Sequence, residues 1–263
     1  MNICINMNKT ALITGASSGI GKELALIHAG KGGNLVLIAR SAAPLNELKE
    51  FILSEYQVNV EVIVADLTAP NAPRKIFEEV HSKQIKIDYL INNAGVGGFG
   101  EFYKRNESDE LNMLRLNMEA LVVLTHLFLP EMIARKSGRI LNVSSIAGFL
   151  PGPMMTTYYA TKAFVNSFSF GLAQEVRKYG VTVTALCPGP LKTNFDTAAG
   201  MGESTLFSRA PGPYSTALKG YKGMERGSLK VLSNWSLRIG VNWIVPFLPL
   251  RWTLSVMEMM HKR

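Results

Sequence analysis

The chain has 263 residues, of which 47% are hydrophobic, and its formal net charge is +8. This length accommodates one large α/β domain or two small ones, and no linker rich in proline, glycine and serine divides it. The basic excess is concentrated at one end, because residues 219–263 hold eight lysines and arginines against Glu225 and Glu258. The nearly neutral remainder argues against a nucleic-acid-binding protein.

Cysteine usage and the first residues bear on the cellular compartment. Cys4 and Cys187 are far apart and lack the spacing of metal ligands, so we expect neither a disulfide framework nor a metal site. Residues 1–8 lack the basic and apolar runs of a secretory signal, and Met7 is an alternative to Met1 as the start. These features together predict a cytoplasmic protein.

The chain begins with a predicted strand, a glycine-rich turn and a helix. Residues 11–13 form an apolar run typical of a buried parallel strand, and a helical pattern begins behind Gly19 and Gly21. Free N–H groups and the helix dipole at such a turn favour a pyrophosphate. The spacing is G-x-x-x-G-x-G rather than the commoner G-x-G-x-x-G, and an ordinary glycine-rich loop is the alternative. The residues expected to hold a dinucleotide here are Gly15, Ser17, Ser18, Gly19, Ile20 and Gly21.

Strand and helix patterns then alternate along the chain. The further expected strands are residues 34–39, 58–65, 87–91, 139–143, 181–186 and a short 229–232. The expected helices are residues 44–56, 72–82, 108–135 and 158–178. Repeated βα units predict an α/β fold, a doubly wound parallel sheet with helices on both faces. We expect one domain over 1–263, with a substrate loop and the short strand in 190–233 and an extension in 234–263.

Two of the predicted helices, 108–135 and 158–178, are apolar on more than one face. One face of each helix must cover the sheet, so the other face needs a second partner. We expect a homo-oligomer formed through the helices near 108–135 and 157–178. The alternative is that the C-terminal segment of the same chain covers them.

Two residues at predicted strand ends bear on the choice of cofactor. Arg40 follows the second strand, where a dinucleotide site places the adenosine ribose, and an arginine there suits a 2′-phosphate. We therefore expect NADP rather than NAD, unless Arg40 only caps the strand end in solvent. Asp66 follows the third strand and is placed either to contact the adenine or to cap a turn.

The predicted chemistry lies after the fifth strand. Tyr158 and Lys162 are four residues apart, so on a helix they share one face. An adjacent ammonium favours the phenolate and lowers the tyrosine pKa toward a useful range. A serine at Ser144 or Ser145, where the strand ends, can donate a hydrogen bond to a substrate carbonyl oxygen. Taken singly, each residue also fits a role in packing, in solvent or in a turn.

From Thr10 to about Thr193 the chain resembles the short-chain dehydrogenase/reductase family, in its compact single-domain branch of the Tyr-x-x-x-Lys type. The matching motifs are residues 14–21, 92–95, 117, 144–145, 158–162 and 188–189. The resemblance implies hydride transfer between NADPH and a ketone or aldehyde. A non-catalytic dinucleotide-sensing or partner-binding module on the same fold is the alternative.

The resemblance also implies a role for each site residue. Tyr158 would be the acid in reduction, Ser145 would orient the carbonyl, and Lys162 would bind the nicotinamide ribose and poise the tyrosine. Asn117 would hold a water that feeds a proton relay. Tyr158 is chosen over Tyr159 because it alone has the four-residue spacing to the lysine. The remaining residues expected around the cofactor are Asn92, Ala94, Gly95, Pro188, Gly189 and Thr193.

The C-terminal extension departs from the family pattern and leaves the substrate open, with an apolar or acyl-chain carbonyl as one expectation. Its apolar run is shorter than the ~20 residues of a membrane span, and Asn242, Pro246 and Pro249 interrupt it. Its tryptophans and basic residues would also suit contact with a membrane surface. A cover over the substrate cleft is the favoured expectation.

Overall fold

The computed structural model describes residues 8–193, 195, 199–200, 210–234 and 238–261. The two possible starts, Cys4 and Trp235 lie outside these residues. The strands are β1 (Thr10–Thr14), β2 (Asn34–Ala39), β3 (Val60–Val64), β4 (Tyr89–Asn92), β5 (Gly138–Val143), β6 (Val181–Cys187) and β7 (Lys230–Leu232). The main helices are α1 (Gly19–Ala29), α2 (Ala42–Glu55), α3 (Ala72–Ser82), α4 (Glu107–Leu114), α5 (Ala120–Ala134), α6 (Thr156–Val176), α9 (Pro213–Glu225) and α11 (Leu250–His261).

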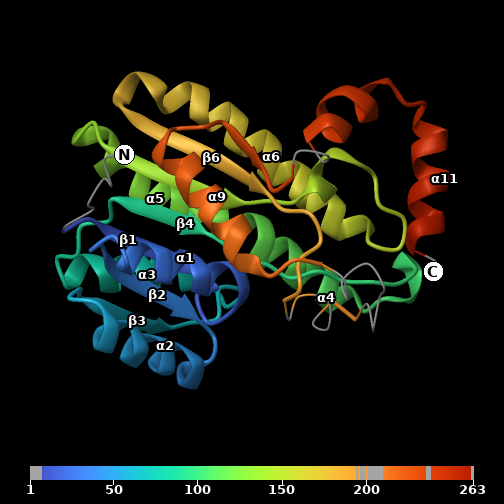
Figure 1. Ribbon diagram of the computed structural model, residues 1–263. Helices are drawn as coiled ribbons and strands as arrows, with labels where there is room; N and C mark the ends of the chain where they lie inside the picture. The colour runs from blue at the N-terminus through green and yellow to red at the C-terminus, as the bar shows by residue number, and fades with distance from the viewer. Residues whose placement is uncertain (1–7, 194, 196–198, 201–209, 235–237, 262–263) are drawn as a thin grey trace.

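The seven strands form one parallel sheet in the order β3-β2-β1-β4-β5-β6-β7, with helices on both faces (Figure 1). The chain winds outward from β1 through β2 to β3, and then returns to the other side of β1 with β4. Such a reversal of strand order opens a crevice at the carboxyl ends of the central strands. The predicted doubly wound fold is confirmed.

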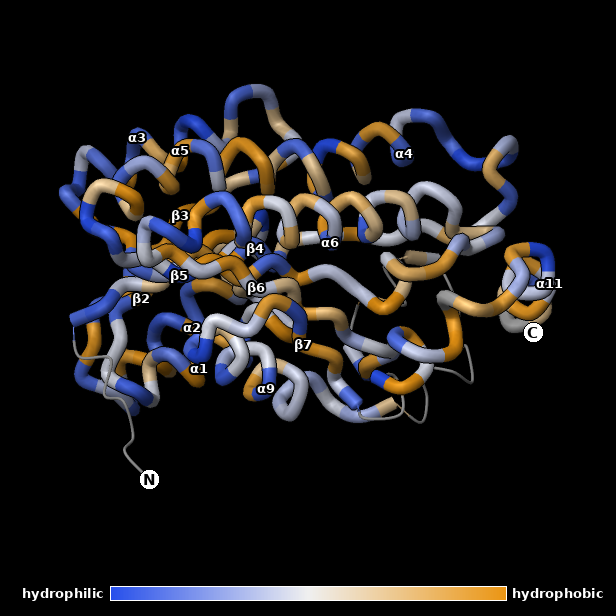
Figure 2. The backbone as a smooth tube through the Cα atoms, turned by 90° about the horizontal axis from the view of Figure 1, so that it is seen from above, coloured by the Kyte–Doolittle hydropathy of each residue, from blue (hydrophilic) through white to orange (hydrophobic). Residues whose placement is uncertain are grey.

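Successive side chains of β1 pack against two different helix layers, one on each face of the sheet. Ala11 and Ile13 belong to a core cluster with residues of α1, α2 and α9, whereas Leu12 belongs to a cluster with residues of α3, α5 and α6. Successive strand side chains point to opposite faces, so a strand that is buried on both faces needs an unbroken apolar run. Figure 2 shows the two helix layers with the sheet between them.

Helix α9 lies where the sequence analysis expected a substrate loop. It packs against α1, and its Tyr221 and Met224 are fully buried. Two of its glycines permit close packing on β6 and β7 of the sheet, because a Cβ on Gly220 would lie 2.6 Å from Leu186 and one on Gly223 would lie 2.2 Å from Val231. Glycine lowers intrinsic helix propensity by about 1 kcal/mol per residue, which conceals the helix in the sequence pattern.

The predicted long helix over 108–135 consists of three segments. A π-helical segment, η2 (Arg115–Glu119), separates α4 from α5. Among the described residues, the combined run Glu107–Ala134 has the length and hydropathy of a membrane span. Core helices of soluble proteins can have the same properties, and here Leu124 and Phe128 pack in the core beside the sheet.

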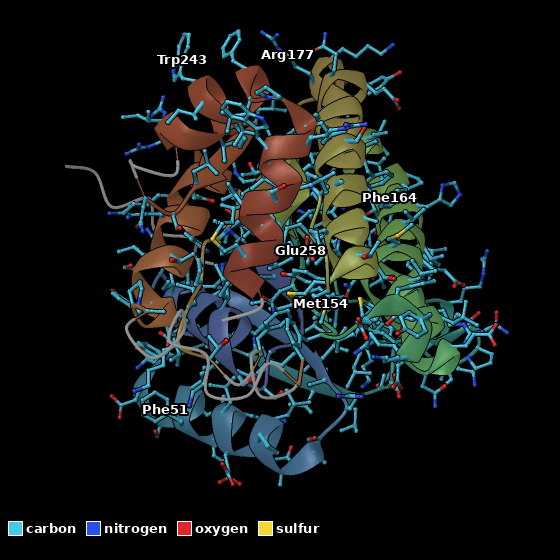
Figure 3. The ribbon with its side chains drawn as sticks, turned by 90° about the vertical axis from the view of Figure 1, so that its right-hand side faces the viewer. Phe51, Met154, Phe164, Arg177, Trp243 and Glu258 are labelled. Carbon is cyan, nitrogen blue, oxygen red and sulfur yellow. The ribbon has the colours of Figure 1, made fainter. Side chains whose placement is uncertain are left out.

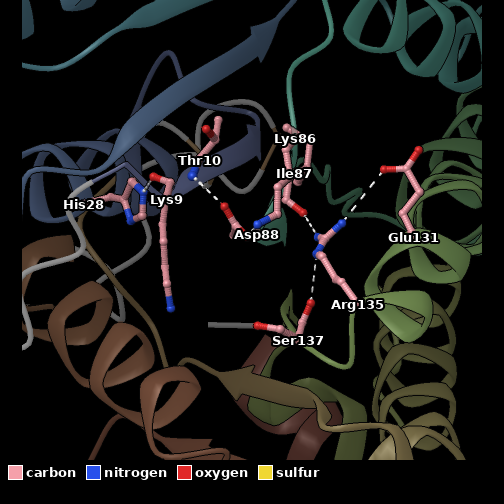
Figure 4. A network of polar contacts seen from close by, with 9 residues as sticks. All are labelled: Lys9, Thr10, His28, Lys86, Ile87, Asp88, Glu131, Arg135 and Ser137. Atoms are coloured by element: carbon pink, nitrogen blue, oxygen red, sulfur yellow. Dashed lines mark hydrogen bonds and ion pairs between the residues drawn. The ribbon is translucent and has the colours of Figure 1, made fainter.

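Polar contacts join the strands at the amino end of the sheet (Figure 4). The Thr10 amide donates to the buried Asp88 carboxylate at 3.2 Å, and Arg135 Nε donates to the Ser137 carbonyl at 3.0 Å. His28 lies 3.1 Å through Nε2 from the Lys9 carbonyl. These contacts lie at the opposite end of the strands from the crevice.

Candidate active site

A cavity of about 580 Å³ occupies the crevice at the carboxyl ends of the strands. It runs from the turn after β1, past the ends of the other strands, to Met257 on α11. The predicted site residues that line it are Gly15, Ser17, Ser18, Gly19, Ile20, Arg40, Asp66, Ala94, Gly95, Ser145, Tyr158, Lys162, Pro188, Gly189 and Thr193. Three predicted residues, Gly21, Asn92 and Asn117, are not among its lining residues.

The turn after β1 depends on glycine at three places. Gly15 and Gly19 have positive φ angles, +66° and +55°, which side chains other than glycine rarely adopt. A Cβ on Gly21 would lie 2.3 Å from the Gly15 carbonyl oxygen. Gly21 therefore lets α1 pack against the turn, while Gly19 opens toward the cavity and lies across from Thr193.

The segment after β4 holds this turn in place through Asn93. Its Nδ2 donates to the carbonyls of Thr14 and Gly15 at 2.9 and 3.1 Å, and its amide donates to Thr14 Oγ1 at 3.0 Å. Asn92, which was predicted to contact the cofactor, points into the core instead. It donates to Asn142 at 2.9 Å and to Thr125 at 3.1 Å. Asn92 and Asn93 have different partners because successive side chains along a strand point in opposite directions.

Arg40 and Asp66 lie at the ends of β2 and β3, as predicted, and both line the cavity. Arg40 is exposed, and its positive charge acts on Asp66. Asp66 Oδ1 accepts hydrogen bonds from the amide and hydroxyl of Thr68 at 2.9 and 2.7 Å. The Thr68 amide bond is the main cause of the lowered Asp66 pKa. Asp66 therefore caps a turn, and it also lines the cavity.

The two serines after β5 have different partners. The Ser144 hydroxyl is buried and donates to the Lys162 carbonyl at 3.0 Å, so it ties the strand to α6. Ser145 Oγ accepts from the Ala147 amide at 3.1 Å and is hydrogen-bonded to Tyr158. Of the two serine hydroxyls, that of Ser145 is therefore the one in contact with Tyr158.

Tyr158 and Lys162 lie one turn apart on α6, as predicted, and both are buried. Lys162 Nζ donates to the Val143 carbonyl at 3.0 Å and lies 5.8 Å from the Tyr158 ring centroid. Burial raises the pKa of Tyr158 to about 12, although the Ser145 bond opposes the shift. Burial also lowers the pKa of Lys162 to about 8. The pKa of Tyr158 is therefore raised by burial, not lowered by the ammonium as expected from the sequence.

Asn117 lies in the π-helical segment η2 and acts on the backbone after β4. Its Oδ1 accepts from the Val96 amide at 2.9 Å, and its Nδ2 donates to the Val96 carbonyl at 2.9 Å and to Thr161 Oγ1 at 3.0 Å. All of its side-chain groups therefore have protein partners. The side chain positions the strand end beside Gly95 rather than lining the cavity.

The outer part of the cavity is apolar and was largely missed in the sequence. Its lining includes Leu150, Met155, Tyr159, Phe195 and Met257, which come from three separate segments. The Tyr159 ring packs edge-on against Tyr158 at 6.0 Å between centroids. No short motif connects these residues, so only the fold brings them together. The expected cover over the cleft corresponds to Met257, which reaches the cavity from α11.

Comparison with known proteins shows the family to which the chain belongs. Residues 9–203 match the sequence profile of the short chain dehydrogenase family. The chain is 37% identical over 187 residues to the very-long-chain 3-oxoacyl-CoA reductase-B of Danio rerio, a match that covers 70% of this chain and 60% of that protein. It is 31% identical over 258 residues to the very-long-chain 3-oxoacyl-CoA reductase of Anas platyrhynchos, covering 96% of this chain and 78% of that one. The chain thus matches about three fifths of the length of the first relative.

A solved structure extends the similarity to the C-terminal segment. The short-chain dehydrogenase from Sphingobium yanoikuyae, in complex with NADPH, superimposes with a TM-score of 0.82 at 31% identity. The alignment covers 97% of this chain and 93% of that one. The shared fold therefore includes most of the region beyond the family profile.

Proposed function

Because the chain belongs to the short-chain dehydrogenase/reductase family, we propose that it is an NADP-dependent reductase that converts an apolar ketone or aldehyde to an alcohol. The observation that carries the proposal is that the buried Tyr158 and Lys162 and the half-buried Ser145 line one cavity together with a glycine turn. A module that only binds a dinucleotide has no need for this arrangement, so the non-catalytic alternative is not favoured.

The residues of the cavity fit a dinucleotide. The turn at Gly15 and Gly19 offers a helix N-terminus to a pyrophosphate, and a side chain at Gly19 would project into the space facing Thr193. Arg40 is placed to pair with a 2′-phosphate, which supports NADP over NAD. When bound, the nicotinamide would supply the hydride for the carbonyl carbon.

The protein's own groups would handle the carbonyl oxygen. The Ser145 hydroxyl donates a hydrogen bond to that oxygen and orients it toward Tyr158. Tyr158 keeps its proton at neutral pH because burial raises its pKa to about 12, so it can donate that proton as the alcohol forms. The Lys162 ammonium, held by the Val143 carbonyl, stabilises the phenolate left behind. A protonated tyrosine favours the direction of reduction.

The cavity wall supports an apolar substrate. Met155, Phe195 and Met257 provide apolar surface next to Tyr158, whose ring centroid lies 5.3 Å from that of Phe195. An acyl chain or a bulky ketone would bury its apolar surface here, which is the main contribution to binding in such pockets. The two curated relatives have names that specify 3-oxoacyl-CoA reduction, which is consistent with a long apolar substrate.

The test is a panel of carbonyl substrates with NADPH and NADH. We expect NADPH oxidation with ketones of increasing apolar size and with 3-oxoacyl thioesters, and a lower rate with NADH. Wild-type protein that oxidises NADPH with none of these carbonyls, while still binding NADPH, would contradict the proposal in favour of the sensing module.

Self-association is a second part of the proposal. A groove on the outer surface of α4, η2, α5 and α6 is lined by Leu111, Leu114, Met118, Val122, Val123 and Phe164, flanked by Arg115 and Glu119. The opposite charges make this surface self-complementary, so a second copy can pair the arginine of one groove with the glutamate of the other. Leu114→Glu is expected to lower the mass measured by light scattering to that of a monomer.

A further inference from the structure

Helix α11 is apolar on two faces. Its inward face carries Thr253 and Met257, which are buried, and Met257 lines the cavity. Its outward face carries Trp252, Val256 and Met259, all exposed. The positions on each face are three or four residues apart, as expected for the two sides of one helix. Covering the cavity therefore does not account for Trp252, Val256 and Met259.

The segment before α11 continues the exposed apolar surface. Trp243 and Phe247 are exposed to 72% and 78%, and Ile244, Leu248 and Leu250 are also exposed. Figure 3 shows Trp243 at the edge of the molecule, pointing away from it, with α11 on the outer surface. We define the cap surface as the outward side chains of residues 238–259. It gathers nine large exposed apolar side chains within the described residues 239–259, namely those five together with Ile239, Trp252, Val256 and Met259. In this it differs from single scattered exposed residues, which need no partner.

The cap surface is rich in the residues that favour a membrane interface. Tryptophan prefers the boundary between headgroups and acyl chains, because its ring is apolar and its N–H is polar. Arg238 and Arg251 are exposed in the same segment, and neither makes an ion pair within the described part of the chain. Lys262 and Arg263 follow in the sequence, and Glu258 is the one carboxylate from residue 238 onward. This charge is complementary to an anionic surface.

The cap surface is also anchored to the body, so it can act as a fixed platform. Lys230 Nζ donates to Asn242 Oδ1 at 2.7 Å and lies 5.0 Å from the Phe149 ring centroid. Val241 is buried beneath the exposed Trp243 segment. A second copy of the chain is a less suitable occupant, because the groove lined by Leu114 and Phe164 already offers a self-complementary face elsewhere.

We propose that the cap surface docks on an anionic lipid bilayer, with Trp243, Phe247 and Trp252 in the interface and Arg238 and Arg251 near the headgroups. The inward face of α11 then places the apolar cavity next to the bilayer. Docking goes beyond the proposed reduction and does not depend on it. An apolar substrate dissolved in the membrane would have a short path to the site.

The experiment uses full-length protein and vesicles of phosphatidylcholine, with or without phosphatidylglycerol. All three tryptophans of the chain, including Trp235, lie between residues 235 and 252, so tryptophan fluorescence, excited selectively over that of the tyrosines, reports on this segment alone. We expect a blue shift and co-sedimentation with the anionic vesicles, both weaker with neutral vesicles and at high salt. Absence of binding to anionic vesicles at physiological salt would overturn the proposal.

Matched variants separate the cap surface from other exposed residues. Trp243→Ser and Trp252→Ser are each expected to weaken vesicle binding roughly tenfold, whereas Phe51→Ser, on α2, should have no effect. Figure 3 shows Phe51 near the opposite end of the molecule from Trp243. Equal loss with Phe51→Ser, or undiminished binding by both tryptophan variants, would refute the assignment.

Charge and oligomeric state provide two further controls. Arg238→Gln with Arg251→Gln should weaken anionic binding roughly fivefold per residue, while Arg74→Gln with Lys75→Gln, on α3, removes the same charge without this effect. Light scattering of the tryptophan variants should give the wild-type mass. A lower mass would assign the cap surface to a second copy and overturn the proposal. Activity on a small soluble ketone remains a separate readout of the reductase.

Discussion

Lowering the pH is expected to destabilise the folded protein through His28. This side chain is fully buried, and its Nε2 lies 3.1 Å from the Lys9 carbonyl oxygen. A carbonyl can only accept, so Nε2 carries the proton and Nδ1 accepts from the Tyr221 hydroxyl at 2.8 Å. A second proton, on Nδ1, would remove the acceptor for the Tyr221 hydroxyl and break that hydrogen bond. The ring also fills the space beside Gly33, where a Cβ would lie 2.2 Å from Nε2.

The magnitude follows from the pKa difference between the two states. Burial lowers the pKa of His28 from 6.5 to about 4 in the folded protein. Below the unfolded pKa, the unfolded chain binds a proton that the folded protein does not, so stability falls as the pH drops from about 6.5 to about 4. Between about pH 7 and about pH 5, the loss amounts to about 2 kcal/mol.

The assay is urea denaturation of the wild type and two variants at both pH values. His28→Gln removes the titrating group. From about pH 7 to about pH 5, the free energy of unfolding of this variant should therefore fall by about 2 kcal/mol less than that of the wild type. His81→Gln, on the exposed surface of α3, is the control for replacing a histidine elsewhere in the chain. Equal pH dependence in the wild type and His28→Gln would refute the reasoning, whatever the absolute stability of the variants.

Four further predictions concern the active site. Tyr158→Phe should lower kcat by about 10²–10⁴-fold with little change in NADPH affinity, while Tyr159→Phe stays active; the reverse result would assign the other tyrosine. Arg40→Asp should weaken NADPH binding about tenfold to a hundredfold and spare NADH, as measured by fluorescence titration, and an unchanged ratio would remove Arg40 from the site. Met257→Ala should raise KM for bulky ketones about tenfold but leave small ketones unaffected, and equal effects on both would argue against a contact with substrate. Because burial lowers the pKa of Lys162 to about 8, the ammonium loses its proton above that pH, and kcat/KM should fall there; a profile that is flat to about pH 10 would contradict the role of Lys162.

The parallel sheet could be predicted because each central strand is a short apolar run next to a recognisable turn. Asn34–Ala39 and Ala72–Ser82, for example, have the predicted boundaries. Helix α9 was missed because its glycines weaken the helical pattern, and its role depends on close contacts with Leu186 and Val231, which are distant in sequence. Long-range packing of this kind leaves no local signal.

The juxtaposition of Tyr158 and Lys162 could be predicted because residues four apart share one face of a helix. The sequence could not show whether a polar side chain faces the cavity or the core. Asn92 and Asn117 are directed to internal partners, and Asn93, which the sequence analysis did not single out, holds the turn after β1. It also could not give the pKa of Tyr158, because burial depends on residues from several segments.

Because of the π-helical segment η2, the packing of the helix that follows depends on the number of residues in this segment. An α-helix turns by about 100° per residue, so one extra residue in a turn rotates everything after it by that angle. Removing one residue from Arg115–Glu119 would restore a regular helix, and Leu124 and Phe128 would then turn away from the core while Asn117 lost its register with Val96. Substitutions on the exposed side of η2 can therefore be tolerated where a single-residue deletion cannot.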